Sequence, residues 1–151
     1  MRIAFLAACL LACSHNTLPG TQIPDTAQNR EVLDTFARYR DRLEARDASG
    51  ILGMAAPTYY DAGDPSHSVG PTDYASLQQK LKTDFAKVTG IKLEATVKEL
   101  AVKDDDAHLD YFQVLRYAVA TPTGEKWKSE SDDARMKFVR VNGEWKIASG
   151  L

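Results

Sequence analysis

Apolar residues recur every three or four positions through the first part of the chain, which is the spacing of amphipathic helices. The first such stretch begins near Asp25, where Asp25 or Thr26 can cap a helix and Gln28 can complete a capping box. Its apolar face would consist of Val32, Phe36, Tyr39 and Leu43. The pattern therefore predicts a helix that starts near residue 25 and ends before Asp47.

Two further helices follow by the same criterion. Asp47 can cap a short helix that Pro57 ends, because proline cannot continue a helix. Residues 61–71 form a loop on composition, since glycine and proline flank a polar stretch. A third helix from about Thr72 to Val88 would have an apolar face made of Tyr74, Leu77, Leu81, Phe85 and Val88.

After Gly90 the apolar period falls to two, which is the period of β-strands. The alternation changes phase after Val97, which predicts a β-bulge near Lys98 and Glu99. Strands at 108–120 and 125–141 follow, and Asn142-Gly143, the dipeptide of a type I′ turn, joins the last pair of strands. Three helices followed by a four-stranded antiparallel meander indicate an α+β fold with the helices on one face of the sheet.

Composition places the chain among single globular domains. It has 151 residues, of which 44% are hydrophobic and 26% are charged, so it can bury a core without disulfide bonds. The formal net charge is -2, and basic residues are scattered among acidic ones. A nucleic-acid partner is therefore excluded by charge.

The first twelve residues are typical of a bacterial signal peptide. Arg2 is followed by an apolar run from Ile3 to Ala12, which is too short to span a membrane. The run ends in Leu10-Leu11-Ala12-Cys13, which resembles the lipobox of bacterial lipoproteins. The resemblance implies cleavage before Cys13, acylation of its sulfur, and a membrane as the partner of that lipid.

The chain has two cysteines, and both lie in this stretch. Leu6-Ala7-Ala8-Cys9 also fits the lipobox, but it would leave a shorter apolar run than Cys13 does. The alternatives are a disulfide between the two cysteines and an ordinary secretory cleavage. Ser14 resembles the residue that permits export to the outer membrane, so we expect residues 1–12 to be removed and the domain to lie in the periplasm.

Residues 13–24 would then tether the folded domain to the lipid. Two prolines and a glycine between Leu18 and Pro24 disfavour helix there. The sequence predicts an extended tether and a folded domain at 25–151. Two or more acyl chains would anchor it stably.

The order of the elements resembles the nuclear transport factor 2-like superfamily, which includes SnoaL-like cyclases, ketosteroid isomerases and scytalone dehydratase. The resemblance covers about Gln28 to Leu151, and its local marks are "ARYRDRLEARDASGILGMAAPTYYDAG" and the closing "NGEWKIASG". It implies a curved sheet that wraps against the helices as a cone, with a pocket at its mouth. It also implies that the sheet can form a homodimer, through a second apolar face of the strand at 108–120.

The resemblance to ketosteroid isomerases can be tested residue by residue. Tyr39 falls where those enzymes have a hydrogen-bonding tyrosine, and Asp64-Pro65 falls near their catalytic base. Their third group is an aspartate that apolar surroundings keep protonated, but Lys137 occupies the corresponding position. The simpler explanations are a core aromatic residue for Tyr39 and a turn residue for Asp64.

Other chemistries find less support. His15, His67 and His108 lie far apart and lack metal-ligand spacing, so no metal or other cofactor is expected. No catalytic residue is assigned. The candidate pocket residues, chosen as aromatic or polar groups near the expected cone, are Tyr39, Tyr60, Asp64, Tyr111 and Trp127. Trp127 either rims the pocket or covers the edge of the sheet.

The sequence favours a lipid-anchored, non-catalytic module whose cone binds a small apolar or amphipathic ligand, or a partner protein, in the periplasm. The alternative is an isomerase or dehydratase on the same scaffold.

Overall fold

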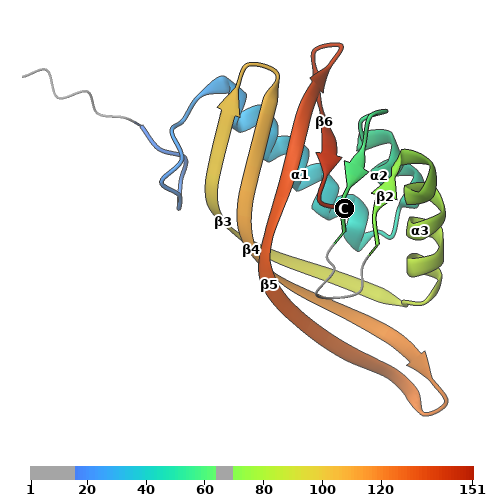
Figure 1. Ribbon diagram of the computed structural model, residues 1–151. Helices are drawn as coiled ribbons and strands as arrows, with labels where there is room; N and C mark the ends of the chain where they lie inside the picture. Colours follow the sequence, from blue (N-terminus) through green and yellow to red (C-terminus); the bar gives the residue numbers. More distant parts are fainter. Residues whose placement is uncertain (1–15, 64–69) are drawn as a thin grey trace, which may run out of the picture.

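The computed structural model describes residues 16–63 and 70–151, and Figure 1 shows their arrangement. The lipobox with Cys9 and Cys13, and the loop residue Asp64, lie outside the described residues.

The three helices form close to where the sequence pattern predicts them. Helix α1 spans Ala27–Glu44, and the Thr26 side chain accepts a hydrogen bond from the backbone N–H of Asn29. Helix α2 spans Ala48–Met54 and is capped by Asp47. Helix α3 spans Tyr74–Ala86 and begins with a reciprocal capping box between Asp73 and Ser76.

A four-stranded antiparallel sheet follows the helices, in the order β3-β4-β5-β6. Its strands are β3 (Gly90–Lys103), β4 (Asp106–Thr121), β5 (Gly124–Val141) and β6 (Glu144–Ser149). The predicted bulge lies between Val97 and Glu99, and the predicted closing turn has positive φ at both Asn142 and Gly143. Two short strands, β1 (Tyr60–Asp61) and β2 (Thr72–Asp73), pair at the ends of the 61–71 loop, which the sequence pattern did not predict.

The sheet curves around α1, and α2 and α3 close one end of the curve (Figure 1). The helical face predicted from periodicity is buried against the sheet, with Val32 at 0% and Phe36 at 3% exposure. The other side of the core comes from the strands, where Leu109, Met136 and Ile147 are fully buried. This is an α+β fold with the helices on the inner face of the sheet.

The N-terminal segment differs from the predicted free tether. The chain folds back between Asn16 and Asp25, where the backbone N–H of Asp25 donates to the carbonyl of Asn16 and that of Leu18 donates to Ile23. Ile23 is 4% exposed and belongs to the hydrophobic core, and the Asn29 side chain donates to the Pro24 carbonyl at 2.7 Å. The folded part therefore begins before residue 25, because an isoleucine in this segment reaches the core.

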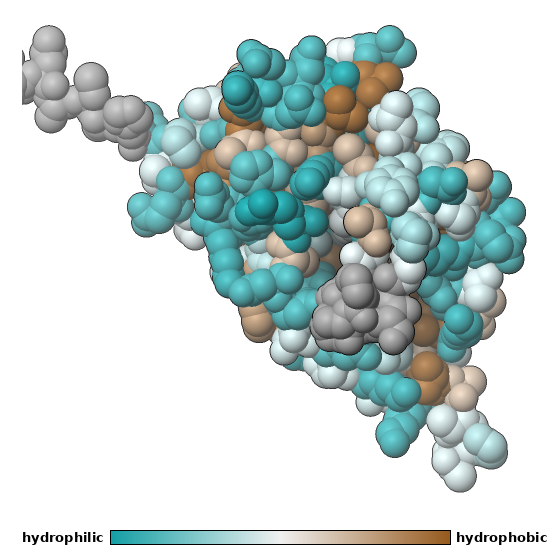
Figure 2. All heavy atoms as spheres, viewed as in Figure 1, coloured by the Kyte–Doolittle hydropathy of each residue, from teal (hydrophilic) through white to brown (hydrophobic). Residues whose placement is uncertain are grey.

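The β4–β5 hairpin extends beyond the helices, at the opposite end of the molecule from the N-terminal segment, drawn in blue (Figure 1). Polar residues cover most of the face shown in Figure 2, and apolar residues form small patches on it, one of them near this hairpin. No helix among the described residues is long and apolar enough to cross a membrane.

Candidate functional site

A cavity lies between the helices and the inner face of the sheet, which is the face of β4 that contacts α1. Its volume is about 690 Å³. All three helices and strands β3, β4 and β5 contribute to its walls. Its apolar lining includes Leu43, Ile51, Leu81, Phe85, Ile91, Leu115 and Val119. The cavity is the space that the curved sheet and the helices leave unfilled.

Two buried tyrosines form part of the wall. Tyr39 of α1 is 8% exposed and Tyr111 of β4 is 3% exposed, and both line the cavity. The Phe36 ring connects them, with its centroid 6.2 Å from that of Tyr39 and 4.8 Å from that of Tyr111. Neither hydroxyl has a hydrogen-bond partner among residues 16–63 and 70–151, so both can donate to a polar atom inside the cavity.

Burial determines the acidity of these hydroxyls. It raises the pKa of Tyr111 to about 12, and the nearby Asp132 carboxylate adds to the rise. Burial raises the pKa of Tyr39 further above its ordinary value, with smaller contributions from Tyr111 and Tyr59. Both phenols are therefore neutral hydrogen-bond donors at physiological pH rather than phenolate bases.

The mouth of the cavity is polar. Four charged residues line it. Two come from α3, Lys80 and Asp84, one is the C-cap of that helix, Lys87, and one comes from β5, Glu130. The hydroxyl of Tyr117 donates to Glu130 at 2.7 Å, so this carboxylate is already engaged. A ligand would meet charges at the entrance and apolar surface with two hydroxyls inside.

The structure brings together two of the five residues that the sequence proposed for the pocket, Tyr39 and Tyr111. Tyr60 is 59% exposed and is not part of the cavity lining, whereas its neighbour Tyr59 is buried and its hydroxyl accepts a hydrogen bond from the Leu151 N–H at 3.1 Å. Asp64 lies outside the described residues.

Trp127 lies on the outer face of the sheet, away from the cavity. It pairs with Ala118, which pairs in turn with Gly90, and these positions alternate with the inward-facing residues of β4. A Cβ atom on Gly90 would be 3.1 Å from the Trp127 ring, so the indole covers the glycine from outside. Trp127 therefore does not rim the cavity, and its ring covers the outer face of the sheet rather than only its edge.

Lys137, the position corresponding to the third group of ketosteroid isomerases, is also directed away from the cavity. It pairs with His108 on the outer face and is exposed, whereas Met136 beside it is buried. The oxyanion device of those enzymes is therefore not reproduced at this position.

Most other lining residues, such as Gln113, Tyr117 and Ala134, were not proposed from sequence. The alternation along β4 did separate its two faces, but it did not show which face the helices cover. The residues from β5 gave no signal, because that part of the strand is polar on both faces.

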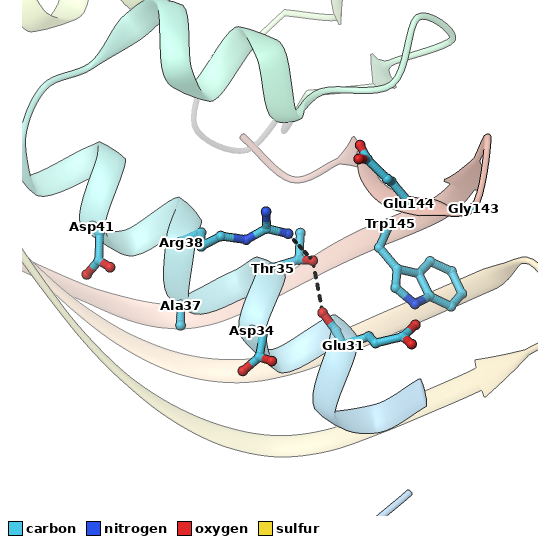
Figure 3. Close-up of a pocket in the computed structure, with 9 residues that line it drawn as sticks. All are labelled: Glu31, Asp34, Thr35, Ala37, Arg38, Asp41, Gly143, Glu144 and Trp145. Atoms are coloured by element: carbon cyan, nitrogen blue, oxygen red, sulfur yellow. Dashed lines mark hydrogen bonds between the residues drawn. The ribbon is translucent and has the colours of Figure 1, made fainter. Parts of the chain in front are cut away.

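A second, shallower groove runs between α1 and the β5–β6 hairpin, and Figure 3 shows the residues that line it. Some of its side chains already bind one another or their neighbours: Arg38 donates to the Thr35 hydroxyl at 3.1 Å, and Glu31 pairs with Arg140 at 2.9 Å. The Arg140 guanidinium also lies 4.4 Å from the Trp145 ring centroid. The groove is better explained as a set of contacts that fasten the hairpin to α1.

Metal binding finds no support in the described part of the chain, which contains no group of three or more histidine, cysteine, aspartate or glutamate side chains placed to hold an ion.

The fold is that of the nuclear transport factor 2-like proteins. A conserved protein of Planctomyces limnophilus superposes with a TM-score of 0.72 at 14% identity, over 82% of this chain and 93% of that one. A nuclear transport factor 2-like superfamily protein of Salmonella enterica has a TM-score of 0.68 at 10% identity, over 80% and 86% of the two chains. A proposed dehydratase of the same family from Streptomyces avermitilis has a TM-score of 0.67 at 15% identity, over 81% and 92%.

No protein-family model and no curated protein sequence matches this chain. At these identities the solved structures are evidence for the fold alone.

Proposed function

We propose that the domain binds a small apolar or amphipathic ligand in the cavity between the helices and the sheet, without transforming it. The observation that carries this proposal is a cavity of about 690 Å³ with largely apolar walls that include two buried tyrosines. Ligand sites of small molecules have this size and this combination of apolar surface with a few fixed polar groups.

The binding proposal is tested by filling the cavity. Ala134 is half-buried in the cavity wall, and Ala134→Leu would occupy part of the space. The probe is the dye 1-anilinonaphthalene-8-sulfonate, whose fluorescence rises in apolar sites. We expect wild type to bind it saturably and Ala134→Leu to bind it about tenfold more weakly, a loss of about 1.4 kcal/mol.

The matched control is Ala101→Leu on the outer face of β3, opposite His108. The same side chain is added there away from the cavity, so dye affinity should equal that of wild type. An equal effect of the two substitutions, or no saturable binding by wild type, would contradict the proposal.

The second candidate function is an isomerase or dehydratase. It is favoured by the position of Tyr39 in the cavity wall and by the likeness to a proposed scytalone dehydratase of Novosphingobium aromaticivorans, with a TM-score of 0.68 at 11% identity over 82% of this chain and 80% of that one. General acid–base catalysis needs a base within hydrogen-bond reach of the proton that it removes. The carboxylates of Glu130 and Asp132 are each engaged, by Tyr117 and Gln113 respectively.

Proton exchange of an enolisable ketone, such as a Δ5-ketosteroid, distinguishes the two functions. We expect wild type and Tyr39→Phe to leave exchange at the uncatalysed rate, and the loss of the hydroxyl to change the free energy of unfolding by at most about 1.5 kcal/mol. Turnover by wild type that falls sharply in Tyr39→Phe would establish an enzyme in place of the binding module.

We further propose that Cys13 is acylated and that the domain is held at the outer membrane, facing the periplasm. The support is the lipobox at Leu10–Cys13 and the serine that follows it. Cys13→Ala should abolish labelling by a palmitate analogue and release the protein from the membrane fraction, while Cys9→Ala should leave both unchanged. The reverse pattern would assign the lipid to Cys9.

A further inference from the structure

Within residues 16–63 and 70–151, no strand pairs with the outer edge of β5 between Gly124 and Ala134. Strand β6 pairs with β5 only between Lys137 and Val141, and every residue from Gly124 to Asp133 is exposed. In Figure 1 this part of β5 forms a free border of the extended β4–β5 hairpin. An edge of this length exposes a row of backbone N–H and C=O groups that can pair with another strand.

On the inner face of the sheet, the charges along this edge are segregated by sign. Lys126 and Lys128 lie at the hairpin end, and Glu130 and Asp132 lie nearer the body of the domain. Charged residues on an edge usually prevent pairing between molecules. Segregation has the opposite effect for an identical strand that runs antiparallel, because the basic half of each strand then faces the acidic half of the other.

We propose that a second copy of this chain pairs with β5 across a two-fold axis at Ser129. Residues opposite each other in such a pair lie on the same face of the continuous sheet. Ser129 would face its own copy, Lys128 would face Glu130, and Lys126 would face Asp132. Each ion pair occurs twice because of the symmetry, and all four lie on the inner face, since these residues pair with the inward-facing side of β4.

The remaining contacts are compatible with this register. Glu125 faces Asp133, but Lys98 already forms an ion pair with Asp133 at 2.5 Å, which offsets the repulsion. Ser149, the last residue of β6, pairs with Lys137, and Gly150 lies against the backbone of Arg135. The proposed pairing ends before them, where Ala134 of each copy lies opposite Gly124 of the other. The outer face of the sheet is a weaker candidate, because ion pairs such as Arg135–Asp110 and Arg116–Glu94 already occupy it.

Charge exchange tests the proposal on the full chain with Cys9 and Cys13 replaced by serine. Sedimentation equilibrium should show a concentration-dependent dimer of this parent. An acidic-edge variant, Lys126→Glu with Lys128→Glu, and a basic-edge variant, Glu130→Lys with Asp132→Lys, should each raise the dissociation constant about tenfold or more. An equimolar mixture of the two variants should dimerise again, because their edges are complementary.

The matched control is Lys82→Glu with Lys103→Glu, which makes the same change of net charge at exposed positions away from β5. It should dimerise like the parent. Circular dichroism melts establish that each variant is folded. A parent that stays monomeric, edge variants that dimerise like the parent, or a mixture that fails to associate would overturn the proposal.

Cysteine cross-linking tests the register. Ser129→Cys in the same parent should form an intermolecular disulfide, since the two-fold axis places the residue opposite itself. Ser131→Cys lies on the same face two residues away and should cross-link far more slowly, because its own copy is four positions distant. Equal rates, or none at Ser129→Cys, would overturn the register and the interface as stated.

Discussion

Gly143 is a residue at which backbone conformation alone decides the cost of substitution. Its φ is +83°, and a Cβ atom added there would meet nothing within 4 Å. A valine would therefore be strained without clashing, and we expect Gly143→Val to destabilise the domain by about 1–2 kcal/mol. Urea unfolding of the purified domain measures this change.

Gly53 provides the control, because it is equally open but lies in helix α2. Gly53→Val should not lower the free energy of unfolding, since valine has a better helix propensity than glycine. Equal destabilisation at both positions would mean that the closing turn does not need its positive φ.

Individual residues also separate what the sequence could predict of the site from what it could not. Periodicity placed Tyr39 and Tyr111 on apolar faces, and the structure buries both in the cavity wall. Trp127 stands among lysines and a glutamate, where no period indicates a face. Its position over Gly90 follows from a cross-strand neighbour that sequence alone does not pair with it.

At the scale of elements, the C-terminal end of α1 is fastened to the edge strand β3 by one carboxylate. Glu44 accepts hydrogen bonds from the Lys92 ammonium at 2.8 Å and from the Leu93 backbone N–H at 3.0 Å. These two bonds, the Lys92 bond first, lower the pKa of Glu44 in the folded state. The backbone bond also occupies an edge group that would otherwise be open.

This contact predicts a pH dependence. A carboxyl group whose pKa is lowered by folding stabilises the protein above its unfolded value, about 4.3, and this stability is lost as the pH falls through the folded pKa. At pH 7 we expect Glu44→Gln to be less stable than wild type by about 1 kcal/mol. The difference should be smaller at pH 3, and an unchanged difference in urea unfolding at the two pH values would contradict the assignment.

Elements with strong local signals were predicted, and those without them were missed. The Asp47 cap, the bulge after Val97 and the Asn142-Gly143 turn each depend on a few neighbouring residues and lie where the sequence places them. Strands β1 and β2 have two residues each, which is too short for any alternation. Their pairing depends on contacts between residues far apart in the chain.

At the scale of the whole molecule, the main difference from the sequence prediction is the docked N-terminal segment. Proline and glycine correctly indicated that residues 18–24 are not helical, but they could not show that Ile23 reaches the core. Ile23→Ala should therefore destabilise the domain by about 2–5 kcal/mol, as expected for a buried isoleucine. A free tether would give no change.

The exposed neighbour Gln22 provides the comparison. Gln22→Ala should leave thermal melting within a degree or two of wild type, because no buried contact is lost. Equal melting temperatures for the two variants would mean that the segment does not contribute to the core.

The docked segment also limits how far an anchored domain could travel. If the lipid is on Cys13, only Ser14 and His15 separate it from Asn16, a span of about 10 Å even when fully extended. Such a domain would stay in contact with the bilayer surface and would diffuse laterally with its lipid, in two dimensions. It would meet ligands that leave the membrane and proteins that share it, whereas a component on the far side of the periplasm would have to come to it.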